Sequence, residues 1–278
     1  MTAVVFFAVL GAAAFHAAWN ALVKSGGDKF QTMLLMSTSQ GLMGLAVAIA
    51  LPFPARESWP WLLGSAVIHS SYKIALTYAY QHGDLSRVYP IARGTAPLIV
   101  AAFGILLLPD VVTSREYVGI FLLALGVLFM ASGVFSNRES RFLLTFSLAS
   151  AAATAGYTLV DGLGARISTN VTAYVAWMFF LDGFLFLSWV LVFRGRWAVP
   201  VPASGWARGI AAGAASFLAY WIAVWAMSVA PIVLVSALRE TSILFAVLIG
   251  VMFFGERGGA VKLASAGLII LGVIVMRV

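Results

Sequence analysis

The chain has 278 residues, of which 62% are hydrophobic and 10% are charged. A soluble domain carries about 25% charged residues, so this chain cannot cover a surface that faces water, and most of it must have lipid as its solvent. The absence of cysteine excludes disulfides and thiolate metal sites. The net charge is +7, but the basic residues are scattered singly along the chain. No basic run of the kind that binds nucleic acid is present.

Ten apolar stretches are long enough to cross a bilayer as helices, since a span needs about 20 apolar residues and must satisfy its own backbone. In chain order they are 2–23, 30–51, 59–81, 85–108, 117–135, 142–165, 170–193, 206–230, 232–254 and 258–278. The first stretch lacks a positively charged leader, so we expect a retained span and not a signal peptide. The connections are short, and no soluble domain fits between the spans.

One segment of the chain occurs twice. A shift of 146 residues (235 minus 89) aligns 89–110 with 235–256 without a gap. The shift superimposes Arg93 on Arg239, Thr95 on Thr241, Gly104 on Gly250 and Asp110 on Glu256. The register continues into the next predicted span, where Gly126, Val127 and Met130 meet Gly272, Val273 and Met276. An ungapped match over roughly forty residues that retains its glycines, its arginine and its terminal acid indicates an internal duplication.

The loop near 136–141 leaves five predicted spans on either side. Two copies of a five-span unit in series must be inverted relative to each other, because an odd number of crossings starts the second copy on the opposite face. We therefore predict an all-α integral membrane protein with ten transmembrane helices as two inverted five-helix repeats, 1–137 and 138–278, that together form one transmembrane domain. Inverted repeats place a substrate site near the midplane, between the halves, which favours a carrier over an enzyme.

The two segments 79–110 and 226–257, each with a third helix of the repeat running through a short turn into a fourth, resemble the drug/metabolite transporter superfamily of the EamA type. The family usually has Gly-Glu at the end of the fourth helix; the second copy keeps Gly255-Glu256, and the first has Pro109-Asp110 instead. The resemblance implies an inverted-repeat carrier for small metabolites, often an exporter of amino acids or drugs, with cytoplasmic termini. Residues 25–30, SGGDKF, resemble a branch suspected of handling phosphonates.

The orientation in the membrane has two conflicting indications. More basic residues fall in the loops on the side opposite the termini, so the positive-inside rule favours termini outside the cytoplasm, whereas the resemblance implies termini inside it. We expect location in a bacterial cytoplasmic (inner) membrane, as a monomer or a homodimer. The expected partners are the bilayer and a small-molecule substrate, with protons as a candidate coupling ion and no nucleic acid.

Polar and aromatic residues recur at helical spacing on four predicted spans. The stripes comprise His16, Trp19 and Asn20 on 2–23; Ser65, His69, Tyr72 and Lys73 on 59–81; Ser150, Thr154, Tyr157 and Asp161 on 142–165; and Tyr220, Trp221 and Trp225 on 206–230. Residues three or four apart share one face of a helix, so the stripes can converge on one lumen. We predict substrate contacts from His16, Trp19, Asn20, His69, Tyr72, Lys73, Tyr157, Trp221 and Trp225. For the tryptophans, the alternative is packing against neighbouring helices.

Lys73 lies near the middle of its span, where an unpaired cation costs about 3 kcal/mol or more. The carboxylates available to neutralise it are Asp161, Asp182 and Glu240, and the alternatives are a substrate contact or a deprotonated amine. The same three acids are candidates for proton coupling or for ion pairs, because a carboxylate at bilayer depth is costly to ionise. Glu240 is also a candidate for binding a substrate ammonium.

Arg93 and Arg239 occupy equivalent positions in the duplicated segment. A guanidinium group binds a carboxylate or phosphate through two parallel hydrogen bonds, so two arginines related by a pseudo-two-fold axis would clamp an anion between the halves. The alternative is that each arginine reaches the membrane surface or bonds to backbone carbonyls freed by a proline. Pro90 and Pro97 favour this alternative for Arg93.

These residues predict a secondary transporter for a small polar metabolite that is amino-acid-like, zwitterionic or an organic anion. The resemblance implies export. The alternatives are a multidrug exporter for lipophilic cations using Glu240 and Asp161, a lipid-headgroup flippase, and a non-transporting scaffold with fully paired charges. No motif of hydrolases, metalloproteases or nucleotide-binding enzymes is present, and the three histidines have no metal-ligand spacing. We therefore expect no catalytic residue, metal or cofactor.

Overall fold

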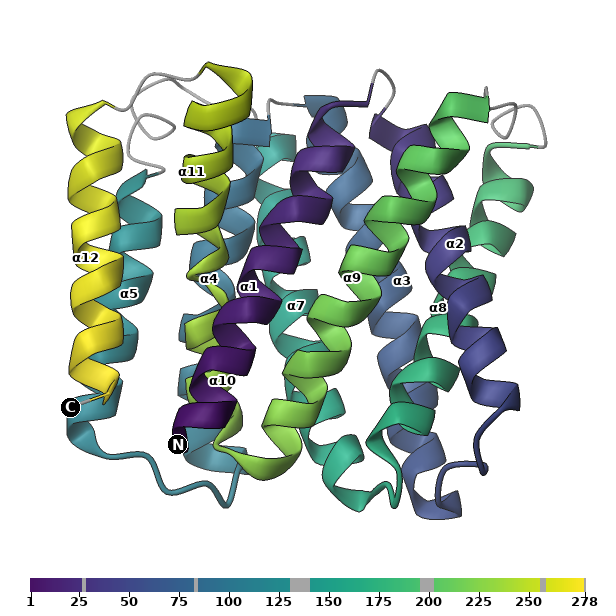
Figure 1. Ribbon diagram of the computed structural model, residues 1–278, viewed down its shortest axis with the longest axis horizontal. Helices are drawn as coiled ribbons and strands as arrows, with labels where there is room; N and C mark the ends of the chain where they lie inside the picture. The colour runs from purple at the N-terminus through teal and green to yellow at the C-terminus, as the bar shows by residue number, and fades with distance from the viewer. Residues whose placement is uncertain (27–28, 83–84, 131–140, 196–202, 256–258, 278) are drawn as a thin grey trace.

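The computed structural model describes residues 1–26, 29–82, 85–130, 141–195, 203–255 and 259–277 (Figure 1). The helices are α1 (Ala3–Lys24), α2 (Lys29–Ile49), α3 (Trp59–His82), α4 (Leu85–Leu107), α5 (Ser114–Met130), α7 (Arg141–Ile167), α8 (Val171–Phe193), α9 (Ala203–Val229), α10 (Ile232–Arg239), α11 (Ser242–Phe254) and α12 (Ala260–Arg277), with a 3-10 turn η1 (Arg56–Ser58) before α3. No residue in the described ranges lies in a strand. The predicted all-α class is confirmed.

The helices run roughly side by side, and successive long helices run in opposite directions, whereas α11 continues in the direction of α10 (Figure 1). Both termini lie at the same end of the molecule, where Nη1 of Arg277 is 3.5 Å from the backbone carbonyl oxygen of Met1. The connections that join α4 to α5, α7 to α8 and α9 to α10 lie at this same end. We call it the terminal face.

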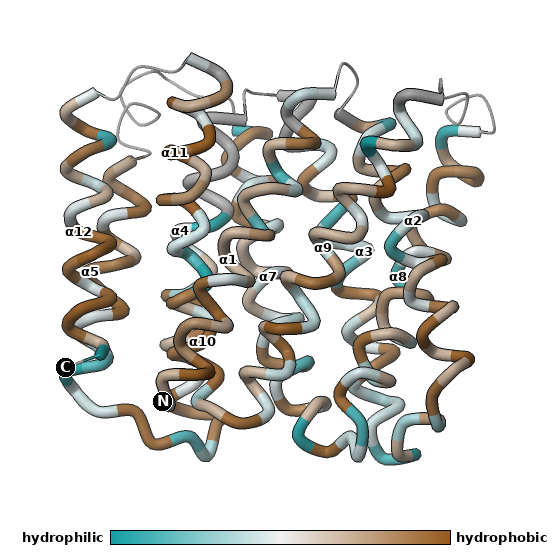
Figure 2. Tube along the Cα trace, in the orientation of Figure 1, coloured by the Kyte–Doolittle hydropathy of each residue, from teal (hydrophilic) through white to brown (hydrophobic). Residues whose placement is uncertain are grey.

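The surface of the bundle suits lipid. Seven of the described helical segments are long and apolar enough to cross a membrane, and one of them combines α10 with α11. Side chains on the outside are apolar, with Leu106, Val192 and Phe253 each at least 75% exposed. Figure 2 shows mostly hydrophobic helices, interrupted by hydrophilic stretches within the bundle. Among the described residues, α3 and α5 do not meet the same criterion, and Arg93–Leu107 of α4 is a shorter apolar segment, so the full count of ten spans stays a prediction.

Helix ends are set by local hydrogen bonds. The hydroxyl of Thr2 accepts from the backbone N–H of Val5 at the start of α1, and the side chain of Asn170 accepts from Ala173 at the start of α8. Before α5, the carboxylate of Glu116 accepts from the backbone N–H of Thr113 at 2.7 Å, and the Thr113 hydroxyl accepts in return from Glu116, which is a capping box. These caps satisfy backbone groups that a helix end leaves open.

The predicted ninth span, 232–254, is broken in its middle. Helix α10 ends at Arg239, and α11 begins at Ser242. Between them the N–H of Glu240 donates to Ala237 and the Thr241 hydroxyl donates to the carbonyl of Leu238 at 2.7 Å. Such short-range bonds compete with the regular helical pattern, which accounts for the break.

Helix α4 is continuous although it contains two prolines. The backbone stays helical from Leu85 to Leu107, through both Pro90 and Pro97. The discontinuity near the duplicated arginines therefore lies in the second copy, which has no proline between Ile232 and Phe254.

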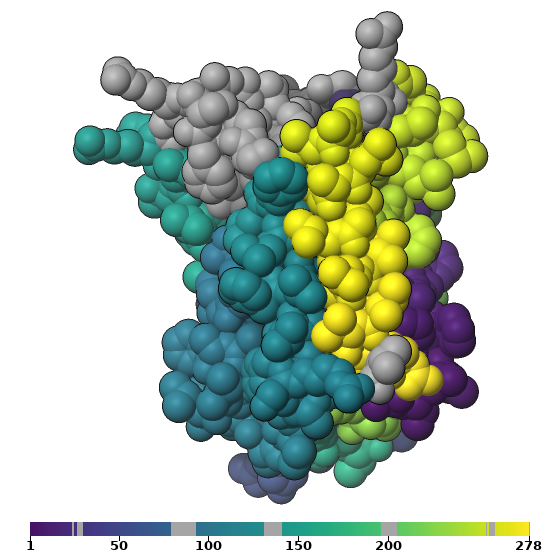
Figure 3. Space-filling model, turned by 90° about the vertical axis from the view of Figure 1, so that its left-hand side faces the viewer, coloured from purple at the N-terminus to yellow at the C-terminus, as the bar shows by residue number. Residues whose placement is uncertain are grey.

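Helices of the two halves pack on one another in pairs: α2 on α8, α5 on α12, α1 on α9, and α3 on α7. Glycines set the closest approaches. A Cβ at Gly44 on α2 would lie 2.6 Å from the carbonyl oxygen of Ala176 on α8, and a Cβ at Gly119 on α5 would lie 2.7 Å from that of Gly272 on α12. Figure 3 shows α5 and α12 side by side along their length. Small residues allow this backbone contact, as in other membrane helix pairs.

We expect Gly44→Ala to destabilise the protein, because the added methyl group collides with the backbone of α8. Over-packing of this kind costs about 1–3 kcal/mol. The matched control is Gly11→Ala on α1, where a Cβ would meet no atom within 4 Å. Thermal unfolding of the purified variants in detergent measures the difference. Equal midpoints for the two variants would contradict the proposed contact.

Candidate functional site

Charged side chains are buried in the middle of the helix bundle. Each is at most 6% exposed, and the set comprises Lys73, Arg93, Asp161, Asp182, Arg239 and Glu240. Burial removes the hydration of a charge, so each must find a counter-charge or hydrogen bonds within the protein. Their partners define three clusters.

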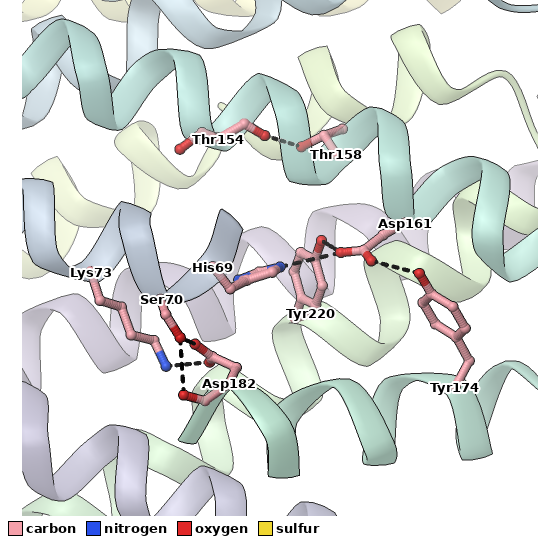
Figure 4. Close-up of polar contacts among 9 residues, drawn as sticks. All are labelled: His69, Ser70, Lys73, Thr154, Thr158, Asp161, Tyr174, Asp182 and Tyr220. Atoms are coloured by element: carbon pink, nitrogen blue, oxygen red, sulfur yellow. Dashed lines mark hydrogen bonds and ion pairs between the residues drawn. The ribbon is translucent and has the colours of Figure 1, made fainter. Parts of the chain in front are cut away.

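The first cluster is built around Lys73 and Asp182 (Figure 4). Nζ of Lys73 on α3 lies 2.5 Å from Oδ2 of Asp182 on α8 and donates to the Ser37 hydroxyl on α2 at 2.7 Å. The Ser70 hydroxyl donates to Oδ1 of Asp182 at 3.0 Å. Of the alternatives that the sequence leaves open for Lys73, the structure therefore has the ion pair, with Asp182 as the partner.

The second cluster surrounds Asp161 on α7, which is fully buried. Its carboxylate is 3.2 Å from Nε2 of His69 on α3, accepts a hydrogen bond from the Tyr174 hydroxyl at 2.9 Å, and accepts another from the Tyr220 hydroxyl (Figure 4). The ring of Tyr157 stacks on His69 with centroids 3.9 Å apart. One acidic group thus gathers donors from α3, α8 and α9.

The third cluster lies at the break between α10 and α11. Nη2 of Arg93 on α4 is 2.9 Å from Oε1 of Glu240, so Glu240 pairs with Arg93 and the expected alternative of a pair with Lys73 is wrong. The guanidinium of Arg239 lies over the ring of Tyr220, 5.1 Å from its centroid. Among the residues that the structure describes, no carboxylate lies within ion-pair distance of Arg239.

The three clusters form one continuous group. His69 and Ser70 are neighbours on α3, Tyr220 contacts both Asp161 and Arg239, and Arg239 precedes Glu240 in the chain. We call this group the buried polar belt, and it comprises Lys73, Asp182, His69, Asp161, Tyr220, Arg239, Glu240 and Arg93. Both halves of the chain contribute to it. Besides its histidine and tyrosine, the belt holds three basic and three acidic side chains. Two of each form ion pairs, Lys73 with Asp182 and Arg93 with Glu240. The remaining two, Arg239 and Asp161, do not pair directly, and Tyr220 contacts both of them.

The predicted stripe on α1 is partly turned onto its own helix. Nε1 of Trp19 donates to Nδ1 of His16 at 3.2 Å, and the amide of Asn20 donates to the backbone carbonyl of His16 at 2.7 Å. His16 also lies within electrostatic range of both Arg93 and Arg239. The stripe is therefore next to the belt, although none of its three side chains donates to a belt residue.

The predicted aromatic residues divide into two groups. Tyr72 and Tyr157 pack edge to face with centroids 5.7 Å apart and so extend the second cluster. Nε1 of Trp221 donates instead to Thr172 at 3.0 Å, near the start of α8, and Trp225 packs against the main hydrophobic core. Both tryptophans are only partly buried, and these contacts match the packing alternative for them.

The model of the EamA-like transporter family matches residues 3–132 and 141–278. This chain belongs to the EamA-like transporter family. The family model matches it twice, once on each side of the gap at 133–140. At the level of the family, this makes the chain a membrane transporter and not an enzyme.

The fold of this EamA-like transporter has relatives among solved structures, of which 29 chains match. One of them, described only as the crystal structure of a protein, has a TM-score of 0.77 and 16% sequence identity, over 98% of this chain and 94% of that one. At this identity, the likeness shows the fold alone. No curated protein matches the chain.

At the terminal face, Asp110 and Arg166 join the two halves of the transporter. The guanidinium of Arg166 on α7 binds both carboxylate oxygens of Asp110, at 2.8 and 3.0 Å. Asp110 also accepts from the backbone N–H of Ile232 at 2.8 Å, and Arg166 donates to the carbonyls of Met227 and Ala230. The ends of α4, α7, α9 and α10 are thereby fastened together.

A cavity of about 510 Å³ opens near the terminal face, between the ends of α1, α5, α10 and α12. Glu116, Leu238 and Arg277 are among its lining residues. Leu238 is the neighbour of Arg239, but no residue of the buried polar belt lines the cavity. Within the described ranges, no group of three or more His, Asp or Glu side chains could hold a metal ion.

Sequence reasoning missed several members of this site. Tyr174, Ser70 and Ser37 were not singled out, although each donates to or accepts from a buried charge. Ser70 follows His69 directly and faces a different neighbour, because consecutive residues are about 100° apart around a helix. Nothing in the sequence near Tyr174 distinguishes it from an ordinary membrane aromatic.

We expect Lys73→Met to destabilise the transporter by about 3–5 kcal/mol, because it leaves the carboxylate of Asp182 buried without its counter-charge. The double variant Lys73→Met/Asp182→Asn removes both charges and should recover most of that loss. The control is Arg56→Met at an exposed position. Chemical or thermal unfolding in detergent measures these three variants and the single variant Asp182→Asn. A double variant as unstable as the sum of its single variants would show that the two side chains are not coupled.

Proposed function

We propose that this EamA-like transporter is a secondary carrier for a small polar metabolite that bears an anionic group, such as an amino-acid-like zwitterion, an organic anion or a phosphonate. It works by alternating access between two inverted five-helix repeats. Export is the direction that the family resemblance favours.

The observation that carries the proposal is the guanidinium of Arg239. It is 6% exposed and, in the described part of the chain, has no carboxylate within ion-pair distance. The ring of Tyr220 offers only a cation–π contact, worth about 0.5–2 kcal/mol. A substrate carboxylate or phosphonate would supply the missing negative charge through two parallel hydrogen bonds.

The break in the ninth predicted span supports this location. Arg239 is the last residue of α10, and α11 begins at Ser242. Secondary transporters commonly form their sites from such discontinuous helices, whose N-terminal ends carry a partial positive charge that attracts anions. The break places Arg239 at the end of a helical segment inside the bundle, where a site of this kind would lie.

Glu240 supports binding of a zwitterion over a simple anion. Its Oε1 pairs with Arg93, while its Oε2 is buried and has no hydrogen-bond partner among the described residues. In the proposal, a substrate ammonium group binds Oε2 while the anionic group binds Arg239. Consecutive residues point about 100° apart around a helix, so the two side chains would hold opposite ends of the substrate and not one group. The clamp of two arginines that the sequence predicts is replaced, in the proposal, by one anion-binding arginine beside one acid that is held by the other arginine.

The helix contacts support inverted repeats. The first helix of each half packs on the third helix of the other, as α1 on α9 and α7 on α3. The second helices of the two halves, α2 and α8, pack on each other, and so do the fifth helices, α5 and α12. A pseudo-two-fold axis between the halves would produce this exchange, and carriers of this kind rock the halves about a site on that axis.

A second part of the proposal concerns the coupling ion. Asp161 is a candidate proton carrier, since it faces two hydroxyl donors and the imidazole of His69 and has no basic lysine or arginine within ion-pair distance among the described residues. Asp182 and Glu240 are engaged by Lys73 and Arg93. Protonation of Asp161 would remove a negative charge next to Tyr220 and hence next to Arg239.

We expect Arg239→Gln to weaken binding of an anionic or zwitterionic ligand at least about tenfold, since a hydrogen bond to a charged group contributes roughly 1.5–3 kcal/mol. The purified protein would be tested by thermal unfolding with glycine, aminomethylphosphonate, acetate and tetramethylammonium, because a ligand that binds the native state raises the midpoint. Uptake into liposomes would follow for any compound that binds.

Wild type and the control Arg56→Gln, at an exposed position, should respond to glycine or aminomethylphosphonate, and Arg239→Gln should not. If only tetramethylammonium raises the midpoint, and Arg239→Gln still responds to it, the anion proposal is wrong and an exporter of lipophilic cations replaces it. If no compound in the panel raises the midpoint but a lipid headgroup does, a flippase is favoured.

A further inference from the structure

The tautomer of His16 is determined by its neighbour on α1. Nε1 of Trp19 lies 3.2 Å from Nδ1 of His16, and the two rings meet edge to face. An indole N–H can only donate a hydrogen bond, so Nδ1 must accept it and cannot carry a proton. A neutral imidazole with an unprotonated Nδ1 carries its proton on Nε2.

The resulting Nε2–H group is buried, and no residue in the described ranges accepts a hydrogen bond from it. A buried donor without an acceptor costs about 1–3 kcal/mol. Such groups are uncommon in folded proteins and call for an explanation, such as a functional role or a bound solvent molecule.

The surroundings of His16 are positively charged. Helix α1 packs on α9, α10 and α11, and His16 lies within electrostatic range of both Arg93 and Arg239. Arg93 is held by Glu240, whereas Arg239 has no carboxylate partner within the ranges described. An uncommitted hydrogen-bond donor and an uncommitted cation therefore lie in the same region of the bundle.

We infer that His16 donates from Nε2 to an oxygen atom of the substrate's anionic group, and that Trp19 is a positioning residue that holds His16 in the donating tautomer. The inference rests on the proposed function. It specifies the ligand further: one with a carboxylate or phosphonate group, of which one oxygen binds Arg239 and another accepts from His16.

The division of labour between the two residues has a physical basis. Arg239 supplies charge, while a neutral imidazole N–H supplies direction without adding a third cation to a site that already holds two guanidinium groups. The site would therefore discriminate against ligands of similar size that lack a hydrogen-bond acceptor, because the His16 N–H would stay unpaired with them.

The tautomer is directly measurable, because the chain has only three histidines. Nitrogen-15 NMR of the full-length protein labelled at histidine would show three rings, and His16→Gln would identify the signal of His16. We expect a neutral His16 with its proton on Nε2 in wild type, and loss of this preference in Trp19→Phe. A proton on Nδ1 in wild type would overturn the inference.

The same sample tests the contact with the ligand. Addition of aminomethylphosphonate should move the Nε2 resonance of His16. In binding measurements, His16→Leu should weaken the affinity for aminomethylphosphonate about tenfold or more. His16→Gln, whose side-chain amide can donate from a similar position, should retain a larger share of the affinity than His16→Leu.

The outcomes separate this inference from the proposed function. If wild type binds aminomethylphosphonate and Arg239→Gln does not, but His16→Leu binds as tightly as wild type, the role of His16 is wrong and the proposed function stands. If wild type binds none of glycine, aminomethylphosphonate and acetate, the proposed function fails together with the ligand contact. Unfolding of the variants without ligand controls for misfolding.

Discussion

A charged side chain enclosed by a helix bundle in lipid must be neutralised inside the protein, because the solvent around the bundle offers neither counter-ions nor hydrogen bonds. In this transporter the requirement applies to six side chains, and for five of them it is met by contacts between the two halves of the chain. Lys73 reaches Asp182, Arg93 reaches Glu240, and His69 reaches Asp161. The same contacts that make the charges tolerable therefore also join the halves.

The two kinds of interface between the halves differ in what they allow. Where α2 meets α8, backbones touch through glycines such as Gly44, and any added atom would collide. The buried polar belt consists instead of hydrogen bonds and ion pairs whose partners can be exchanged for groups of a substrate. For the proposed carrier, the glycine-lined pairs would supply rigid contacts, and the belt would supply the part that responds to a ligand. The bonds of Asp110 and Arg166 fasten the helix ends at the terminal face.

The chemistry of the proposed site follows from an unequal distribution of partners. The belt has equal numbers of basic and acidic side chains, yet Asp161 is surrounded by three donors while Arg239 has only the ring of Tyr220 in the described part of the chain. The negative charge of Asp161 is thus solvated by hydrogen-bond donors of the protein, whereas the positive charge of Arg239 is not. A neutral donor at His16 beside that charge would favour ligands with directional acceptors, such as carboxylates and phosphonates.

Composition, apolar segment length and the internal match between 89–110 and 235–256 sufficed to predict a helical membrane transporter of the EamA type and to point to its buried charges. These are local or one-dimensional properties, and a single chain carries them in full. The partners of those charges, by contrast, cannot be read from the sequence. The rotation of each helix toward its neighbours decides that Glu240 binds Arg93 and not Lys73, and that Tyr174 binds Asp161. The same holds for the break of the ninth predicted span at Glu240. Only the tertiary structure determines that rotation, because it results from packing all helices at once, with close approaches set by residues as small as Gly44.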